Sequence, residues 1–247
     1  MYNATSFQDS QQAAELVAGM EALGHVLTET QLNQFGSYIA LLDKKNTQLN
    51  LTRIPSAEIV PLHFLDCLAI FQILSFYGTP RLLDLGSGAG FPGLPLKIMY
   101  PQLALTLLDA ARKRLDFLRN TVRALQLTNV EYIHERAELV GRTAPHREGY
   151  DYVTARAVAK LNTLVELTLP LLRVGGVAIL YKSDKVDEEV ASAQRALELL
   201  GGAIETATPV AIQGTDIERK LIIIKKVNST PAEYPRSTSQ IKRKPIS

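Results

Sequence analysis

The apolar positions of the chain follow one period up to about residue 75 and another after residue 80. From residue 8 to residue 75, apolar residues recur three and four positions apart, as in ELVAGMEAL (15–23) and FGSYIALLDKK (35–45), which predicts helices. After the turn signal GTP (78–80), short apolar runs alternate with helical stretches. This alternation is typical of an α/β domain with a mainly parallel sheet.

The helical part carries its own start and stop signals. Thr28 and Gln31 have the spacing of a capping box, so we expect a helix to begin there and to stop at KKN (44–46). The stretch PSAEIVPLHFLDCLAIFQIL (55–74) predicts one or two further helices, with Pro61 near a first turn.

The alternating part is expected to form one doubly wound domain. The predicted strands are RLLDLG (81–86), LALTLLD (103–109), VEYIHE (130–135), YDYVTAR (150–156), VAILYK (177–182) and KLIIIKKV (220–227). The predicted helices are PGLPLKIMY (92–100), RKRLDFLRNTVRALQL (112–127), a short one near LVGR (139–142), NTLVELTLPLLR (162–173) and DEEVASAQRALELL (187–200). These elements leave no room for a second substrate domain.

The end of the chain differs in two ways from the part before it. The connection GTDIERK (214–220) is too short for a crossover helix, so the last strand is predicted to be antiparallel. The residues that follow are rich in Pro, Ser, Lys and Arg, which predicts a tail that is loosely ordered or that orders on a partner. We therefore divide the chain into an N-terminal helical subdomain (1–77), a main domain (78–228) and a basic tail (229–247).

Composition narrows the function classes. The net charge is only +2, so the chain as a whole lacks the strongly basic character that announces nucleic-acid binding. Cys67 is the single cysteine, and the four histidines lack the spacing of a zinc site, so no disulfide and no metal centre is predicted. The first residues lack the features of a signal peptide, and no apolar run approaches the roughly 20 residues of a membrane span. We expect a cytoplasmic protein.

The glycine-rich segment RLLDLGSGAGFPGLPLKI (81–98) can be interpreted in two ways. The spacing of Gly88, Gly90 and Gly93 matches the dinucleotide fingerprint of NAD or FAD proteins. Counted from Asp84, the spacing through Gly86 and Gly88 is that of the first motif of methyltransferases that use S-adenosylmethionine. Either interpretation places glycine at a strand-to-helix turn, where a Cβ is poorly tolerated.

The rest of the chain favours the second interpretation. Asp109 ends the next strand and can bind ribose hydroxyls in both cofactor classes, so it does not discriminate. An antiparallel last strand is the order expected of methyltransferases. Asp84 would repel a pyrophosphate, whereas a carboxylate is compatible with the cationic sulfonium and the amino group of S-adenosylmethionine.

Several motifs together resemble those of one methyltransferase family. They are NLTRI (50–54), HFLD (63–66), DLGSGAGFPGLPL (84–96), LLDAARKRLDFL (107–118), RAE (136–138), VTARAVAKLNTLVELTLPLL (153–172) and YPR (234–236). They are similar to those of the small-subunit ribosomal RNA methyltransferase G family, also called glucose-inhibited division protein B. The resemblance implies a Rossmann-like class I methyltransferase fold, α/β with a mainly parallel sheet, an antiparallel last strand and N-terminal helices.

The resemblance also implies a reaction and a site. The reaction is methyl transfer from S-adenosyl-L-methionine to N7 of a guanosine in the 530 loop of 16S ribosomal RNA, as naked RNA or in the small ribosomal subunit, by an enzyme expected to be a monomer. Family motifs and the arguments above together give these candidate residues: Asp84, Gly86, Gly88, Phe91, Asp109, Ala110, Ala111, Ala137, Glu138 and Arg156 for the cofactor, with Arg156 also as the catalytic candidate.

Individual roles follow for some of these residues. Phe91 is expected to pack on the cofactor, the Ala137 amide and the Glu138 carboxylate to bind the adenine edge, and Ala110 and Ala111 to leave space for the ribose. Guanine N7 has a free lone pair and needs no general base, so catalysis by positioning is expected. Arg156 would then bind guanine O6, a phosphate or the cofactor carboxylate.

Basic residues near these motifs are candidates for binding phosphates. They are Arg112, Lys113, Arg114, Arg123, Arg136, Lys160, Lys182, Arg236, Lys242, Arg243 and Lys244. The tail departs from the family pattern, because Ser239 and Ile241 stand where Gly and Pro are usual.

Three other functions stay open from the sequence. They are an NAD-dependent oxidoreductase, a non-catalytic RNA-binding or ribosome-assembly protein, and a methyltransferase with a small-molecule or protein acceptor.

Overall fold

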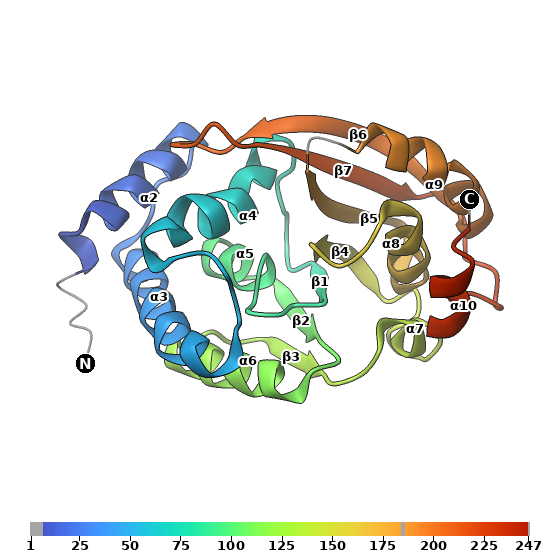
Figure 1. Ribbon diagram of the computed structural model, residues 1–247, viewed down its shortest axis with the longest axis horizontal. Coiled ribbons are helices and arrows are strands. Elements are labelled where there is room, and N and C mark those ends of the chain that lie inside the picture. Colours follow the sequence, from blue (N-terminus) through green and yellow to red (C-terminus); the bar gives the residue numbers. More distant parts are fainter. Residues whose placement is uncertain (1–6, 184–185, 247) are drawn as a thin grey trace.

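A single mixed sheet forms the centre of the computed structural model, which describes residues 7–183 and 186–246 (Figure 1). Within these residues the sheet has seven strands in the order β3-β2-β1-β4-β5-β7-β6. Their bounds are β1 Arg81–Leu85, β2 Ala104–Leu108, β3 Val130–Ile133, β4 Tyr150–Arg156, β5 Leu172–Ser183, β6 Gly202–Ala211 and β7 Glu218–Lys226. The six predicted strands are all present.

Strands β1 to β5 are parallel, and β7 is antiparallel to both of its neighbours, β5 and β6. The predicted reversal of the last strand is therefore confirmed. Strand β6 was missed by the six-strand prediction, because most of its side chains are at least partly exposed and its sequence, GAIETATPVA, has little apolar alternation. It is the hairpin partner that the short connection before β7 requires.

Helices cover both faces of the sheet (Figure 1). The helices of the main domain are α5 Gly93–Met99, α6 Arg112–Ala124, α7 Ala137–Val140, α8 Leu161–Thr168 with the 3₁₀ turn η4 Leu169–Leu171, and α9 Asp187–Leu200. The core has two parts because successive strand residues point to opposite faces: Leu82 belongs to the cluster beneath α5 and α6, and Leu83 to the cluster beneath α8 and α9.

The N-terminal helices α2 (Gln11–Ala22) and α3 (Glu29–Leu49) share the first of these core clusters. The capping box is confirmed: the Gln31 amide donates to Thr28 Oγ1 (3.2 Å), and the Thr28 amide donates to Gln31 Oε1 (2.9 Å). The predicted stop at residues 44–46 was too early, because these residues are compatible with a helix and α3 ends only where Asn50 turns left-handed (φ 47°).

The prediction of one or two regular helices over residues 55–74 was wrong in its detail. The segment is a chain of short pieces: the 3₁₀ turn η1 (Ser56–Glu58), the π-helical η2 (Val60–Leu65), α4 (Asp66–Leu68) and the 3₁₀ turn η3 (Ala69–Gln72). Pro61 lies in the first turn of η2 and lacks an amide hydrogen, which favours irregular backbone hydrogen bonding in this segment.

The prediction of a loosely ordered tail was also wrong. The described part of the tail packs on its own domain, and residues Thr238–Arg243 form α10. Ile241 is 3% exposed. The division into residues 1–77, 78–228 and 229–247 stays a prediction, and Ser247 and the first six residues considered for a signal peptide lie outside the described residues. In the part that is described, no helix is long and apolar enough to cross a membrane.

Candidate active site

A cavity of about 320 Å³ opens at the carboxyl ends of β1 and β2, the edge where parallel sheets bind ligands. Its volume is within the range of small-molecule sites. Its walls come from the ends of both strands, the start of α7, the loop before α8, α8 itself and the tail. The lining residues are Leu85, Gly86, Leu108, Asp109, Ala110, Glu135, Arg136, Ala137, Glu138, Val158, Ala159, Thr163, Leu167, Thr238, Ile241 and Lys242.

Among the glycines of the first motif, Gly86 is the one that lines this cavity. Its φ is +71°, and a Cβ at this position would lie 3.0 Å from Val158 Cγ2. A side chain would therefore be strained and would push into the wall that Val158 forms. Glycine at position 86 keeps this wall of the cavity open.

The Asp109 carboxylate is buried at the end of β2, and it holds the surrounding loops together. Its Oδ2 accepts from the Gly88 amide (2.9 Å) and its Oδ1 from the Ala111 amide (2.8 Å). Two backbone donors leave lone pairs free on both oxygens, because an ionised carboxylate can accept about four hydrogen bonds. Asp109 thus has acceptor positions for a pair of ribose hydroxyls, and its role toward the cofactor stays a prediction.

The Glu138 carboxylate lines the cavity from the first turn of α7. Its side chain is 8% exposed, and Arg136 Nε donates to Glu138 Oε1 at 3.3 Å. Ala137 and Ala110 lie on neighbouring parts of the wall. A buried acid with a free oxygen, beside small residues, suits the donor groups of an adenine edge, so these residues fit S-adenosylmethionine.

Asp84 is placed differently from what the sequence suggested. It is fully buried beneath the loop and does not line the cavity. Its Oδ1 accepts from Thr154 Oγ1 (2.9 Å) and its Oδ2 from the Gly93 amide (3.3 Å). Burial raises the pKa of Asp84 to about 6, against the opposing hydrogen bonds. It joins β1, β4 and α5, so in this structure the Asp84 carboxylate is bonded within the fold and does not face the cavity.

Three other predicted cofactor residues also lie outside the cavity. Gly88 and Ala111 contribute through their amides to Asp109. The Phe91 ring is 8% exposed and stacks on His63 (4.1 Å between centroids) and on Tyr38 (5.3 Å). Phe91 therefore packs against the N-terminal elements, a contact that the motif could not predict because its partners are distant in sequence.

Arg156 ends β4 and points toward the N-terminal elements. Its guanidinium lies 3.0 Å from Asp66 Oδ2 and donates to Leu62 O (2.8 Å) and Cys67 Sγ (3.2 Å). Asp66 is fully buried and is shared with Arg219, whose Nε donates to Asp66 Oδ1 (3.0 Å). Arg156 is thus held in a buried ion pair rather than pointing at the cofactor cavity.

His63 and Asp66 do not form a pair. His63 Nε2 hydrogen-bonds Thr52 Oγ1 (2.7 Å), and its Nδ1 is buried with no partner among the described residues. Burial and the nearby Arg156 and Arg219 charges lower the pKa of His63 to about 3, so it is neutral. It acts as a core histidine.

A second cavity, of about 310 Å³, lies beside the first. Its lining residues are Arg156, Ala157, Ala159, Tyr181, Lys182, Ser183 and Arg219. Ala159 lines both cavities, so the segment 157–159 separates them. Ala157 has φ +57°, a strained conformation for a residue with a Cβ, and such strain concentrates at functional sites.

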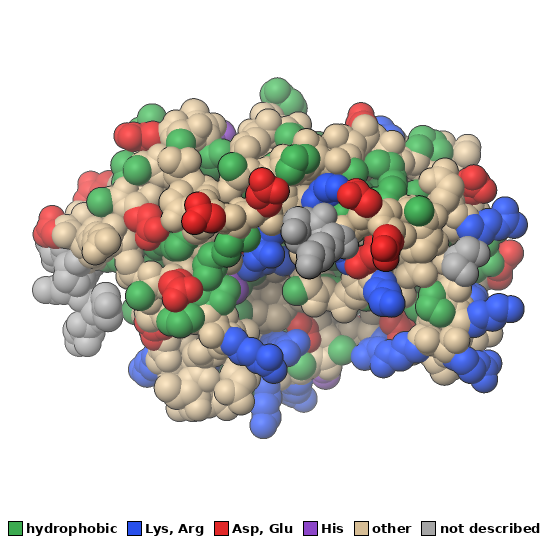
Figure 2. All heavy atoms as spheres, turned by 45° about the horizontal axis from the view of Figure 1, so that its top comes forward, with side chains coloured by type: hydrophobic (Ala, Val, Ile, Leu, Met, Phe, Trp, Pro, Cys, Tyr) green, Lys and Arg blue, Asp and Glu red, His purple; other side chains and the backbone are tan. Residues whose placement is uncertain are grey.

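The second cavity is lined by three basic residues, and each of them has an acidic partner outside the lining: Arg156 and Arg219 share Asp66, and Lys182 pairs with Glu189 (2.6 Å). Lys182 is among the predicted phosphate ligands, but Arg219 was not predicted. Arg219 is the second residue of β7 and pairs with Ser183 at the end of β5. The signal was present in the predicted reversal of the last strand, since an antiparallel β7 must begin where β5 ends. Figure 2 shows Lys and Arg side chains around the hollowed middle of one face, with acidic side chains gathered above it.

Comparisons with known proteins agree with this architecture. The family model described as GidB, rRNA small subunit methyltransferase G, matches residues 31–222. The Ribosomal RNA small subunit methyltransferase G of Roseiflexus castenholzii is 47% identical over 94% of this chain and 99% of its own. The relative of that name from Lachnoclostridium phytofermentans is 43% identical over 93% of this chain and 96% of its own.

Among solved structures, a SAM dependent methyltransferase from Aquifex aeolicus matches 68% of this chain and 92% of its own, with a TM-score of 0.51 and 16% identity. This likeness concerns the fold alone. The family match and the two sequence relatives assign the chain: it belongs to the rRNA small subunit methyltransferase G family.

Proposed function

We propose that this protein transfers the methyl group of S-adenosyl-L-methionine to N7 of a guanosine in the 530 loop of 16S ribosomal RNA. The observation that carries the proposal is the pair of adjacent cavities at one edge of the sheet, which share Ala159. One fits a nucleoside-like cofactor, and the other is lined by cations that suit RNA.

In the first cavity, Asp109 would accept from the ribose hydroxyls, while Glu138 and the Ala137 amide would bind the adenine edge. Leu85, Leu108 and Leu167 supply apolar wall against the adenine ring. When bound, the cofactor supplies an electrophilic methyl group on a cationic sulfur. The residues of the chain bind and orient the cofactor and the RNA, and they exclude water from the site.

In the second cavity, Lys182 and Arg219 would bind the RNA backbone or guanine O6. Guanine N7 already carries a lone pair, so no side chain has to remove a proton. The protein's task is to hold N7 in line with the methyl group and to exclude water, which is catalysis by positioning. Hydrogen bonds to N7 itself would block the reaction, so the cations must contact other atoms.

We assign Arg156 a positioning role. Its ion pair with Asp66 fixes the end of β4, and the strained Ala157 follows directly in the segment that separates the cavities. Arg156 also forms part of the second cavity's wall, so contact with the RNA is compatible with its position.

An NAD-dependent oxidoreductase is no longer supported. The family match and the two relatives assign methyltransferase chemistry. The reversed β7 between β5 and β6 also departs from the dinucleotide-binding strand order. Because the proposed acceptor is ribosomal RNA, we place the enzyme in the cytoplasm and expect it to act as a monomer.

The test uses purified protein, methyl-labelled S-adenosylmethionine, and small ribosomal subunits or naked 16S RNA from a strain lacking this enzyme. We expect label in 7-methylguanosine, confined to the 530-loop fragment. Comparison of subunits with naked RNA identifies the form of the acceptor. Unlabelled RNA in both samples, with a protein that binds the cofactor, would refute the RNA substrate.

A further inference from the structure

The C-terminal tail contributes a wall to the cofactor cavity. Thr238, Ile241 and Lys242, all on α10 (Thr238–Arg243), line it together with residues of α7. Ile241 is 3% exposed although α10 has only six residues, so its side chain is held against the domain and not left in solvent. None of these residues belongs to the glycine loop or to the motif RAE.

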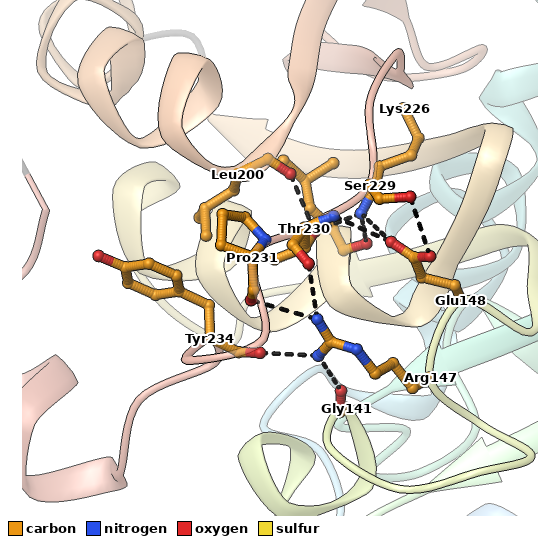
Figure 3. Close-up of polar contacts among 10 residues, drawn as sticks. Gly141, Arg147, Glu148, Leu200, Lys226, Ser229, Thr230, Pro231 and Tyr234 are labelled. Atoms are coloured by element: carbon orange, nitrogen blue, oxygen red, sulfur yellow. Dashed lines mark hydrogen bonds and ion pairs between the residues drawn. The ribbon is translucent and has the colours of Figure 1, made fainter.

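Arg147 is one anchor of the tail (Figure 3). Its guanidinium donates to four backbone oxygens: Thr230 O (2.7 Å), Pro231 O (3.2 Å), Tyr234 O (2.7 Å) and Gly141 O (2.9 Å). Three of these oxygens belong to the tail, and the fourth belongs to the turn after α7. A planar guanidinium with fixed donors ties the two segments together.

Arg142, from the same turn, adds to this anchor. Its Nε donates to Pro235 O (2.7 Å) and its second nitrogen to Glu233 O (2.9 Å). The segment that carries the cavity residues Ala137 and Glu138 thus continues directly into Arg142 and Arg147, which hold the tail that carries α10.

Arg236 forms the second anchor, immediately before α10. It pairs with the fully buried Glu166: Nε donates to Oε1 (2.9 Å), the terminal nitrogen to Oε2 (2.6 Å), and the Arg236 amide also donates to Oε1 (2.8 Å). Such two-point, charge-assisted pairs are among the stronger polar contacts. Glu166 lies on α8, between the cavity residues Thr163 and Leu167.

We propose that α10 is a structural part of the S-adenosylmethionine site, with Ile241 supplying apolar wall and Lys242 a cation at its rim, and that the three arginines act as positioning residues for it. The inference rests on the proposed assignment of the first cavity to the cofactor. The tail therefore contributes to cofactor affinity whether or not it also contacts RNA.

The test measures binding of S-adenosylhomocysteine by calorimetry, with no RNA present. Deletion of residues 237–247 keeps both anchors and removes α10, and we expect the Kd to rise about tenfold or more through loss of apolar contact. Ile241→Ala is expected to raise the Kd in the same direction. Thermal unfolding of the ligand-free proteins checks that each variant is folded.

Lys242 and Arg243 provide a matched pair of exposed cations on one helix, of which Lys242 lines the cavity. Lys242→Ala should weaken binding severalfold, and Arg243→Ala should leave it unchanged. S-adenosylhomocysteine should also slow tryptic cleavage after these residues in the wild-type protein.

A Kd within twofold of the wild-type value in the folded deletion variant would overturn the inference. A Kd within twofold of the wild-type value in both Ile241→Ala and Lys242→Ala would also overturn it. If the deletion unfolds, these two point variants decide. A wild-type protein that bound S-adenosylhomocysteine but left RNA unlabelled would refute the proposed function and leave this inference intact.

Discussion

The two adjacent cavities are similar in size but differ in the charged residues that line them. The first has apolar walls and charged residues of both signs, whereas the charged lining residues of the second are all basic. In the first they are Asp109, Glu135, Glu138, Arg136 and Lys242, and in the second Arg156, Lys182 and Arg219. Hydroxyl and amino donors of a nucleoside are matched by carboxylates, and the phosphates of RNA are matched by cations. The difference indicates which cavity takes the methyl donor and which takes the acceptor.

The cavities also differ in how the chain builds them. Most of the first comes from residues 85–138, around two consecutive strand ends, with α8 and the tail completing it. The second requires β4, β5 and β7, and its arginines are fixed by Asp66 from the N-terminal region. Mutations should therefore separate cofactor binding, RNA binding and stability.

The largest effect is expected from Arg156→Ala. The substitution leaves Asp66 buried with Arg219 as its remaining ion-pair partner, so we expect a loss of about 3 kcal/mol in the free energy of unfolding, together with much slower methyl transfer. Urea unfolding measures the loss of stability, and the label transferred to RNA measures the rate of methyl transfer. A loss below about 1 kcal/mol with methyl transfer abolished would instead indicate direct action on the substrate.

Asp109→Ala should affect the first cavity alone. It removes the proposed ribose acceptor and the partner of the Gly88 and Ala111 amides, so we expect the S-adenosylhomocysteine Kd to rise about a hundredfold, or roughly 2.7 kcal/mol. Asp109→Asn, which keeps one acceptor oxygen, should show a smaller rise. Wild-type affinity in the alanine variant would remove Asp109 from the site.

Lys182→Met should affect the second cavity more than the first. Lys182 pairs with Glu189 (2.6 Å) and donates to Ala159 O (3.1 Å) in the wall that the cavities share. We expect the KM for the RNA acceptor to rise about tenfold through loss of a phosphate contact, while the cofactor Kd changes about twofold or less. Lys160→Met is the control, because Lys160 is exposed in the same region and lines neither cavity. Equal effects of the two substitutions would mean that only general charge matters.

The smallest effect concerns Lys226, which lies near the tail and away from both cavities. Burial lowers its pKa from 10.5 to about 8, partly offset by Glu148. The unfolded chain then holds this proton more tightly, so stability should rise with pH between about 8 and 10.5.

The Lys226→Met variant should not show the part of this rise that comes from Lys226. Between roughly pH 7.5 and pH 9, its free energy of unfolding should increase by about 1 kcal/mol less than that of the wild-type protein. Thermal unfolding of both proteins at the two pH values measures it. Parallel pH profiles would show that Lys226 keeps an ordinary pKa in the folded protein.

The sequence predicted most of the sheet because its parallel strands are apolar runs with clear boundaries, and YDYVTAR (150–156) matches β4 residue for residue. It missed β6, whose exposed edge position removes the apolar signal. It also predicted a loose tail from composition. The tail is instead held by Arg147 and Arg236, whose partners are distant in sequence.

The site was predictable where it depends on local turns. Gly86, Asp109, Ala110, Ala137 and Glu138 all line the cavity as the motifs suggested. Asp84, Phe91 and Arg156 do not, because their orientation is decided by Thr154, by His63 and by Asp66 on other elements. A motif gives the residues of a loop but not the direction in which each side chain points.

The assignment of donor and acceptor cavities is tested most directly by photocrosslinking. Small-subunit RNA carrying 6-thioguanosine at the proposed target position is irradiated with the protein and S-adenosylhomocysteine, and the crosslinked peptides are identified. The account predicts crosslinks to the wall of the second cavity, at residues 156, 157, 159, 181–183 or 219, with S-adenosylhomocysteine still bound. Crosslinks confined to other surfaces, or displacement of S-adenosylhomocysteine by the RNA, would contradict it.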